Sequence, residues 1–396
     1  MNIIFITTLY PAFPNQSRME MSYAVHYFAQ EYAKQHEVTV IRLFPSYPSL
    51  FNAFGKARRA KKILQHEDKF DMDGVSVCRI PIRKYPKIDY FRQDVIEVSK
   101  RAIKCLGQDA APDLVICDIL NPSIYVGERI SKHFKSKLVA SLHNSDKFYL
   151  QKNKNRLKFM AIEDHIENII FRSTVIETAF MKMYKGKKDA TAFATVLFGI
   201  QDGDLLSEQE FLTKINKPMK EIVVACSLIE LKKVNVLISA FSRISSNSDY
   251  ILRVIGDGPE KMRLMELAVL AGCKDQVIFE GQKSREDVLR CMQNADVFAM
   301  VSSPETFGLV YVEAMAKGCI TIGSRGEGID GVIVDGLNGY LCSPDSVVEL
   351  EQVLKKALQI DIQEKEAILS CARITASEMT YKKLAIELLN KVEIRG

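Results

Sequence analysis

The stretch from Asp296 to Gly318 constrains the fold most strongly, because it joins a buried strand to a helix through a short polar loop. Its first residues are mostly apolar, which predicts a strand, and Pro304 breaks the polar run that follows. Apolar residues then recur at helical spacing from Leu309 onward, and the final glycine is a good helix stop. A helix that follows a parallel strand directs its free N–H groups at the carboxyl edge of the sheet, where open α/β folds hold phosphate.

Two carboxylates flank this turn, Glu305 and Glu313, with seven residues between them. Were the whole span helical, they would lie about 12 Å apart along the axis. That exceeds the roughly 5–9.5 Å between the two carboxylates of a glycoside hydrolase. The spacing suits a long ligand held at both ends with a pyrophosphate between them. One glutamate capping the helix and the other facing solvent is the alternative that the spacing alone leaves open.

This arrangement resembles the signature of the retaining glycosyltransferases of family 4, which have the GT-B fold. The chain carries it as Glu305-Thr306-Phe307-Gly308-Leu309 through Glu313-Ala314. The resemblance implies that Glu305 meets the donor sugar and that Glu313 binds the nucleotide ribose. It also implies that the backbone around Gly308 holds the sugar and the pyrophosphate.

Further matches to the family lie between residues 221 and 345. Relatives hold the pyrophosphate with an arginine and a lysine five residues apart; Lys232 matches the lysine, but Ser227 stands at the arginine position. Lys233, where relatives have glycine, is the candidate to compensate. The glycine turn after the strand at residues 250–256 is expected beside the nucleotide, and Gln282 near the base. The donor-binding residues that the resemblance implies are therefore Ser227, Lys232, Lys233, Gly256, Gly258, Gln282, Glu305, Thr306, Phe307, Gly308, Leu309 and Glu313.

The first half of the chain begins with a βαβ pattern, with strands over 2–8 and 37–44 and a helix over 20–35. A later strand over 137–142 ends in the polar run His143-Asn144-Ser145-Asp146, at the place where α/β sheets carry chemistry. In the family a histidine here reaches the junction of donor and acceptor, which makes His143 a catalytic candidate beside Glu305 and Lys232. A loop histidine that only makes hydrogen bonds is the alternative.

The acceptor side departs from the family pattern. Relatives carry glycine in the first loop, whereas this loop has none and places Ser17 and Arg18 there. Relatives also have glycine after the histidine, where this chain has Asn144. We expect these three residues to contact the acceptor. Residues 147–188 are expected to be helical apart from a short strand over 173–177.

The length of 396 residues predicts two domains. We expect a Rossmann-like acceptor-binding domain over 1–200, a linker over 201–220 and a Rossmann-like nucleotide-sugar-binding domain over 221–377. A helix over 378–396 is expected to pack back on the first domain, as in the GT-B fold, whose two domains face each other across a cleft.

Charge is divided unevenly between the halves, with a net +11 over residues 1–200 and −6 over the remainder. Residues 51–64, FNAFGKARRAKKIL, interleave basic and apolar residues, which indicates a helix that rests on an anionic membrane. An ordinary exposed helix is the alternative. We expect no nucleic-acid partner.

No metal site is expected, because Asp71-Met72-Asp73 precedes Gly74 and an alternating strand and so predicts a turn. Nine scattered cysteines without a CxxC pair indicate reduced core thiols and a cytoplasmic protein. The first residues predict a strand and not a signal peptide.

These features predict a metal-independent retaining glycosyltransferase without a cofactor. It would move a sugar from a UDP- or GDP-sugar to a carbohydrate or lipid-linked saccharide, in cell-surface polysaccharide or glycolipid synthesis. Two alternatives remain: a nucleotide-sugar epimerase of the same architecture, which needs no acceptor, and a silent binding protein on this fold.

Overall fold

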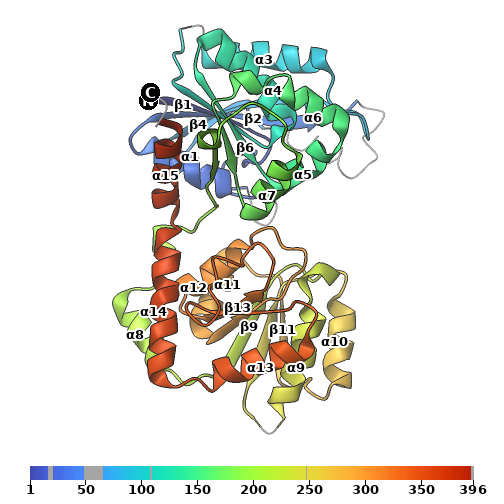
Figure 1. Ribbon diagram of the computed structural model, residues 1–396, viewed down its shortest axis with the longest axis vertical. Coiled ribbons are helices and arrows are strands. Elements are labelled where there is room, and N and C mark those ends of the chain that lie inside the picture. Colours follow the sequence, from blue (N-terminus) through green and yellow to red (C-terminus); the bar gives the residue numbers. More distant parts are fainter. Residues whose placement is uncertain (17–20, 49–65, 108, 247, 394–396) are drawn as a thin grey trace. The chain divides into compact units, whose positions relative to one another are not determined.

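The computed structural model describes residues 1–16, 21–48, 66–107, 109–246 and 248–393. Two compact units divide these residues, and each is built on its own parallel sheet (Figure 1). Unit 1 comprises residues 1–197 together with 384–396, and unit 2 comprises residues 198–383. Both are α/β bodies of the Rossmann-like type that the sequence predicts.

Unit 1 contains an eight-stranded sheet in the order β3-β4-β2-β1-β5-β6-β7-β8. All neighbours are parallel except β3, which pairs antiparallel with β4. The central strands are buried along nearly their whole length, as expected for a sheet covered on both faces. The strands are β1 (Asn2–Thr7), β2 (Glu37–Ser46), β3 (Lys69–Met72), β4 (Val75–Arg83), β5 (Leu114–Asp118), β6 (Lys137–Leu142), β7 (Asn168–Phe171) and β8 (Phe193–Thr195).

Helices cover both faces of this sheet, and each buries an apolar stripe against it. In α4, for example, Ile124 and Ile130 are fully buried while Lys132 on the same helix is exposed. The helices of unit 1 are α1 (Ala24–Ala33), α3 (Arg92–Leu106), α4 (Leu120–Phe134), α5 (Asn144–Gln151), α6 (Asn153–Met160) and α7 (Thr174–Met183).

The C-terminal helix α15 (Tyr381–Glu393) returns to unit 1, as predicted. Leu384, Leu388 and Val392 are buried along one face. The Tyr32 hydroxyl of α1 donates a hydrogen bond of 2.9 Å to the backbone oxygen of Ala385. Figure 1 accordingly shows α15 lying beside α1.

Unit 2 contains a six-stranded sheet in the order β11-β10-β9-β12-β13-β14, parallel throughout. Helices connect the successive strands from β9 to β13, and a loop leads from β13 to β14. Because the strands are parallel, the loops that follow them gather at one edge of the sheet. The strands are β9 (Glu221–Ala225), β10 (Ile251–Ile255), β11 (Val277–Gly281), β12 (Val297–Ala299), β13 (Ile320–Ser324) and β14 (Tyr340–Cys342). The helices are α8 (Glu208–Asn216), α9 (Val234–Ser245), α10 (Lys261–Leu270), α11 (Arg285–Asn294), α12 (Leu309–Ala316), α13 (Val347–Leu358) and α14 (Ile362–Glu378).

The residues predicted as a linker, 201–220, carry structure of their own. Ser207 caps α8 by accepting a hydrogen bond from the backbone N–H of Glu210. Phe211 and Ile215 of this helix are buried within unit 2. The segment is polar in overall composition, and the apolar face of this amphipathic helix is only a few residues wide, so the sequence did not predict the helix.

The short strand expected over residues 173–177 is wrong. Ser173 is instead the N-cap of α7, and its hydroxyl accepts a hydrogen bond of 3.3 Å from the backbone N–H of Ile176. The strand of this region is β7, which begins five residues earlier. A serine followed by β-branched residues is compatible with a strand or with the capped start of a helix, and in this structure it starts a helix.

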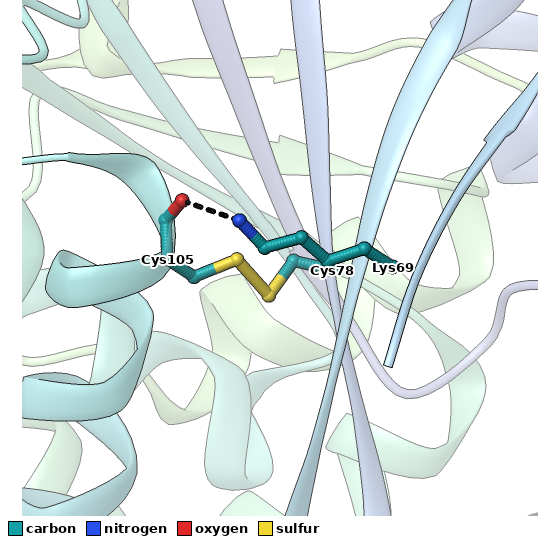
Figure 2. Close-up of a disulfide and its surroundings, with 3 residues drawn as sticks. All are labelled: Lys69, Cys78 and Cys105. Atoms are coloured by element: carbon teal, nitrogen blue, oxygen red, sulfur yellow. Dashed lines mark hydrogen bonds between the residues drawn. A yellow bond between two sulfur atoms is a disulfide. The ribbon is translucent and has the colours of Figure 1, made fainter. Parts of the chain in front are cut away.

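The prediction that all cysteines are reduced is also wrong for one pair. A disulfide joins Cys78 of β4 to Cys105 of α3, and the Lys69 ammonium donates a hydrogen bond of 3.3 Å to the Cys105 backbone oxygen beside it (Figure 2). Because α3 packs on β4, cysteines separated by 27 residues meet in space, which spacing alone does not reveal. The other seven cysteines are free thiols.

Asp73 and Gly74 form the turn of the β3–β4 hairpin, with φ of 52° and 79°, so of the turn predicted at Asp71-Met72-Asp73 only Asp73 is in a turn, whereas Asp71 and Met72 end strand β3. The Asp71 carboxylate accepts a hydrogen bond from Ser76, and the Asp73 carboxylate pairs with His26. No helix within the described residues is long and apolar enough to cross a bilayer.

Candidate functional site

Glu305 lies in the loop between β12 and α12, where the sequence places the sugar end of a donor. Its carboxylate accepts a hydrogen bond of 2.8 Å from the Ser302 hydroxyl and one of 3.1 Å from the backbone N–H of Thr306. Lys232, which follows β9, forms an ion pair of 2.6 Å with the same carboxylate. The side chains of Glu305 and Lys232 are only 11% and 23% exposed, so solvent screens this pair weakly.

Glu327 holds this loop in place, a role that the sequence did not reveal. Its carboxylate accepts hydrogen bonds from the backbone N–H of Glu305 (2.7 Å) and from the Ser303 hydroxyl (2.6 Å). The backbone N–H of Gly328 donates in turn to the Glu305 backbone oxygen. Glu327 follows β13, the neighbour of β12, so the strand order was the signal that locates it.

The start of α12 is shaped by Gly308, which caps the helix with φ of +75°. A Cβ atom there would lie 2.4 Å from the Tyr311 ring, so only glycine fits. Phe307 is buried, and Leu309 is the first helical residue. The first N–H groups of α12 therefore emerge next to Glu305, the arrangement that holds anions at helix N-termini.

Glu313, one turn further along α12, belongs to a three-residue charge cluster. Arg285 donates to its carboxylate at 2.9 Å and also binds Asp204 at 2.6 Å. Burial raises the pKa of Glu313, and Arg285 lowers it in part. Arg285 and Asp204 were not predicted as site residues, since neither belongs to the quoted motif.

A cavity of about 330 Å³ adjoins Glu313 and Arg285 at the carboxyl edge of β9, β10 and β11. Of the predicted donor-binding residues, Ser227, Gly256, Gln282 and Glu313 line it. Its size falls within the range of ordinary small-molecule sites. Residues distant in sequence thus converge on one hollow of unit 2.

The glycine turn after β10 forms one wall of this cavity. Gly256 has φ of +134°, and a Cβ atom on it would lie 1.8 Å from the Cys226 backbone oxygen. A Cβ atom on Gly258 would lie 2.4 Å from the backbone oxygen of Leu228, whose N–H donates to the Asp257 backbone oxygen. The turn therefore lies directly against the loop that carries Ser227.

Lys233 has a different environment from Lys232. Its backbone has φ of +51°, a conformation that glycine adopts more easily, and its ammonium pairs with Asp345 at 2.9 Å. The ion pair with Asp345 competes with the compensating role that the sequence suggested.

In unit 1, His143 follows β6 and caps α5. Its Nε2 lies 2.6 Å from the carboxylate of Asp118, the last residue of the neighbouring strand β5. Asp118 is fully buried and also accepts hydrogen bonds from Ser141 (3.0 Å) and Thr7 (3.3 Å). Burial raises the pKa of Asp118, but His143, Arg172 and Ser141 outweigh it and hold that pKa below its usual range.

A second buried carboxylate, Asp146, supports the same loop. It accepts hydrogen bonds from the backbone N–H groups of His143 (2.8 Å) and Leu120 (3.0 Å). Burial raises its pKa to about 6. Asn144 opens α5 and is half-buried, whereas Ser17, Arg18 and the basic segment 51–64 lie outside the described residues.

Within the described residues, no group of three or more His, Cys, Asp or Glu side chains is arranged to hold a metal ion.

Comparisons with known proteins agree with this geometry. The family model for glycosyl transferases group 1 matches residues 207–371, a range that includes every predicted donor-binding residue. N-acetyl-alpha-D-glucosaminyl L-malate synthase of Bacillus anthracis is 28% identical over 295 residues, which cover 72% of this chain and 73% of that protein.

Solved structures with the GT-B fold superpose on the whole chain. Anabaena HepE in complex with UDP has a TM-score of 0.71 at 19% identity, covering 99% of this chain and 100% of that chain. The apo form of the lipopolysaccharide outer core galactosyltransferase WaaB has a TM-score of 0.67 at 17% identity, covering 100% of both chains. At such identities the superpositions establish the fold.

Proposed function

We propose that this chain, which matches the family model for glycosyl transferases group 1 over residues 207–371 and has the GT-B fold, transfers the sugar of a nucleotide-sugar with retention of its anomeric configuration and without a metal ion. The acceptor is a carbohydrate or a lipid-linked saccharide. The observation that carries this proposal is the pairing of Lys232 with Glu305 beside the N-terminus of α12.

Glu305 and Glu313 mark the two ends of the donor in this proposal. Glu305 positions the sugar through its hydroxyl groups, and Glu313 accepts hydrogen bonds from the ribose. Arg285 keeps Glu313 oriented, since it binds this carboxylate and that of Asp204 together. Glu327 fixes the backbone of Glu305 and so the position of the sugar.

Lys232 and the first N–H groups of α12 stabilise the negative charge that develops on the diphosphate. When the bond between the anomeric carbon and the phosphate oxygen breaks, the acceptor hydroxyl oxygen forms its bond on the same face. The departing phosphate oxygen takes the acceptor proton, so no separate strong base is needed. Ser227, at the arginine position of relatives, leaves Lys232 as the main side-chain cation of this step.

Unit 1 supplies the acceptor side, with His143 as the proposed catalytic histidine and Asp118 as the residue that orients its ring. The anionic membrane contact predicted for residues 51–64 remains part of the proposal for a lipid-linked acceptor.

Anabaena HepE has been solved with UDP and with UDP-glucose, so UDP-sugars are the first donors to test. The purified full-length chain is incubated with a panel of radiolabelled UDP- and GDP-sugars and saccharide acceptors, with and without EDTA. We expect transfer to an acceptor that persists in chelator, and NMR of the product to show the anomeric configuration of the donor. Free isomerised sugar without transfer, an inverted product or activity that Mg²⁺ alone restores would each contradict part of the proposal.

A further inference from the structure

Unit 1 contains a second cavity, of about 560 Å³, that neither the family motif nor the donor site explains. It runs along one face of α4, where Tyr125, Arg129 and Lys132 follow one another at helical spacing, and Asn121 lines it from the non-helical start of the same element. The start of α3 and the helix α6 contribute its other walls. The volume lies within the range of small-molecule sites. We call this cavity the α4 groove.

Asp89 holds one end of the α4 groove rigid. Its carboxylate accepts hydrogen bonds of 2.8 Å from the Asn121 amide, the Lys158 ammonium and the backbone N–H of Tyr90. Burial raises the pKa of Asp89, but these donors outweigh it and hold the pKa below its usual range. Asp89 is thus satisfied by protein groups, and it fastens the loop before α3 to both α4 and α6.

The α4 groove carries an excess of positive charge. Four basic residues line it, against the two carboxylates of Asp89 and Glu128. Lys158 pairs with Asp89 and Lys132 with Glu128 at 2.5 Å. Across the part of the chain that the structure describes, Arg92 and Arg129 have no ion-pair partner, so two guanidinium groups remain available to an anion.

Two tyrosines complete the lining. Tyr90 and Tyr125 are half-buried, and Tyr125 shares a hydrogen bond of 3.0 Å with the Tyr149 hydroxyl. Such rings offer an apolar face together with a polar hydroxyl. A sugar ring presents apolar C–H faces and hydroxyl groups, so it matches this mixture better than a purely apolar ligand does.

The groove opens towards the carboxyl edge of the unit 1 sheet. Asn121 lies three residues after Asp118, the partner of His143, and Asp89 follows the end of β4. The backbone N–H of Leu120, between them, donates to Asp146 in the loop of His143. The α4 groove therefore begins at the loops that the proposed function assigns to the acceptor.

We propose that the α4 groove binds an anionic sugar, one that carries a phosphate or a carboxylate, through Arg92 and Arg129 with the sugar ring against Tyr90 and Tyr125. The proposal deepens the proposed function, on which it rests for identifying this sugar as part of the acceptor. Binding itself requires only unit 1.

Saturation-transfer NMR and calorimetry on the full-length chain test the proposal with glucose 6-phosphate, glucuronate and neutral glucose. We expect both anionic probes to bind more tightly than glucose, and UDP not to displace them. The double variant Arg92→Gln/Arg129→Gln should weaken the anionic probes by about tenfold or more. Arg101→Gln, an exposed arginine of α3 away from the groove, is the matched control and should bind like wild type.

Equal affinity for glucose and the anionic probes, or equal loss in Arg101→Gln, would overturn the proposal. Vesicles containing a glucuronosyl diacylglycerol show whether the anionic sugar is lipid-linked or free. If wild type binds these vesicles and the double variant does not, the sugar is lipid-linked. If wild type binds only the soluble probes, the sugar is free. UDP affinity is measured in parallel. GDP and GDP-sugars are tested beside UDP and UDP-glucose. If one of these nucleotide ligands binds but the anionic probes do not, the groove proposal alone fails. If the probes bind but none of the nucleotide ligands does, the proposed function fails instead.

Discussion

Both units carry carboxylates at the carboxyl edge of a parallel sheet, but the burial and the partners of these carboxylates differ. In unit 1, Asp118 is fully buried and is surrounded by His143, Ser141 and Thr7. In unit 2, Glu305 and Glu313 are held by Lys232 and Arg285, and Glu313 lines an open cavity. A fully buried carboxylate held by several protein hydrogen bonds mainly fixes a loop, whereas a carboxylate paired with a cation beside a cavity can exchange that partner for a ligand.

We interpret this difference as a division between residues proposed to act on the donor and residues that shape the scaffold, including the loop of the proposed catalytic His143. Substitutions in unit 2 should therefore change turnover and nucleotide affinity with little effect on unit 1. Substitutions around Asp118 should change the stability of unit 1 while unit 2 still binds nucleotide. The predictions that follow test this division, beginning with the largest effect.

Replacing Glu305 by Gln should lower turnover by on the order of 10²-fold or more, because a sugar displaced by about 1 Å loses its alignment. Bare UDP should bind nearly as before, since Glu305 lies at the sugar end. Steady-state transfer assays and UDP titration measure the two effects. Glu286→Gln, an exposed glutamate of α11, serves as the matched control; turnover above a tenth of wild type in Glu305→Gln would contradict the assignment.

Replacing Asp118 by Asn should destabilise unit 1 by about 3 kcal/mol, because it disrupts the buried hydrogen bonds that the carboxylate makes with His143, Ser141 and Thr7. UDP affinity should remain unchanged. Hydrogen exchange of the β5 and β6 amides reports the stability of unit 1 without assuming that both units unfold together. Asp164→Asn, at an exposed carboxylate of the same unit, is the control. If the β5 and β6 amides of Asp118→Asn stay fully protected from exchange while UDP binding is lost, the assignment of Asp118 to the scaffold of unit 1 is wrong.

The raised pKa of Asp146, about 6 against an ordinary 3.8, makes unit 1 sensitive to pH. Between these values the folded state binds more protons than the unfolded one, so stability should fall as pH rises from about 4 to about 6, by up to about 3 kcal/mol. The pKa of Asp118 is lowered, so the contribution of Asp118 to stability changes only at pH values below its ordinary pKa, outside this range. Exchange rates corrected for their intrinsic pH dependence measure the slope, which should flatten in Asp146→Asn; an unchanged slope would exclude Asp146 as its source.

Residues 51–64 should contribute about 1 kcal/mol per basic residue near an anionic membrane. The charge difference between the halves, +11 against −6, is the reason to test it. Liposome co-sedimentation at low and high salt compares wild type with a variant in which five residues are changed to Gln: Lys56, Arg58, Arg59, Lys61 and Lys62. Wild type should co-sediment with anionic vesicles at low salt. It should dissociate from them as salt shortens the Debye length to about 3 Å at 1 M. Equal retention of both proteins would make the segment an ordinary exposed one.

Sequence reasoning located the local structure correctly where the informative residues are consecutive. The strand, loop and helix around Glu305 were located from the apolar pattern and from Gly308, which tolerates no side chain. The glycine turn of Gly256 was located in the same way, because glycine at a tight turn is visible in the sequence itself.

Sequence reasoning failed where two interacting residues lie on elements that are distant in the sequence. Glu327 and Arg285 act on Glu305 and Glu313 from 22 and 28 residues away, and Asp118 reaches His143 from the neighbouring strand. The disulfide between Cys78 and Cys105 was missed because it depends on how α3 packs on β4. Periodicity specifies neither strand order nor the packing of helices on a sheet. Knowing that β5 and β6 are adjacent would have brought Asp118 and His143 to neighbouring strand ends.

The most direct test of the account is calorimetric binding of UDP and UDP-glucose to wild type, Glu305→Ala and Glu313→Ala. The assignment of the two ends predicts that Glu313→Ala weakens both ligands by about 1.5–3 kcal/mol, the range for hydrogen bonds to a charged group. Glu305→Ala should leave UDP unchanged and remove only the additional affinity of UDP-glucose over UDP. Equal loss of bare UDP affinity in both variants would contradict the claim that Glu305 holds the sugar and Glu313 the nucleotide.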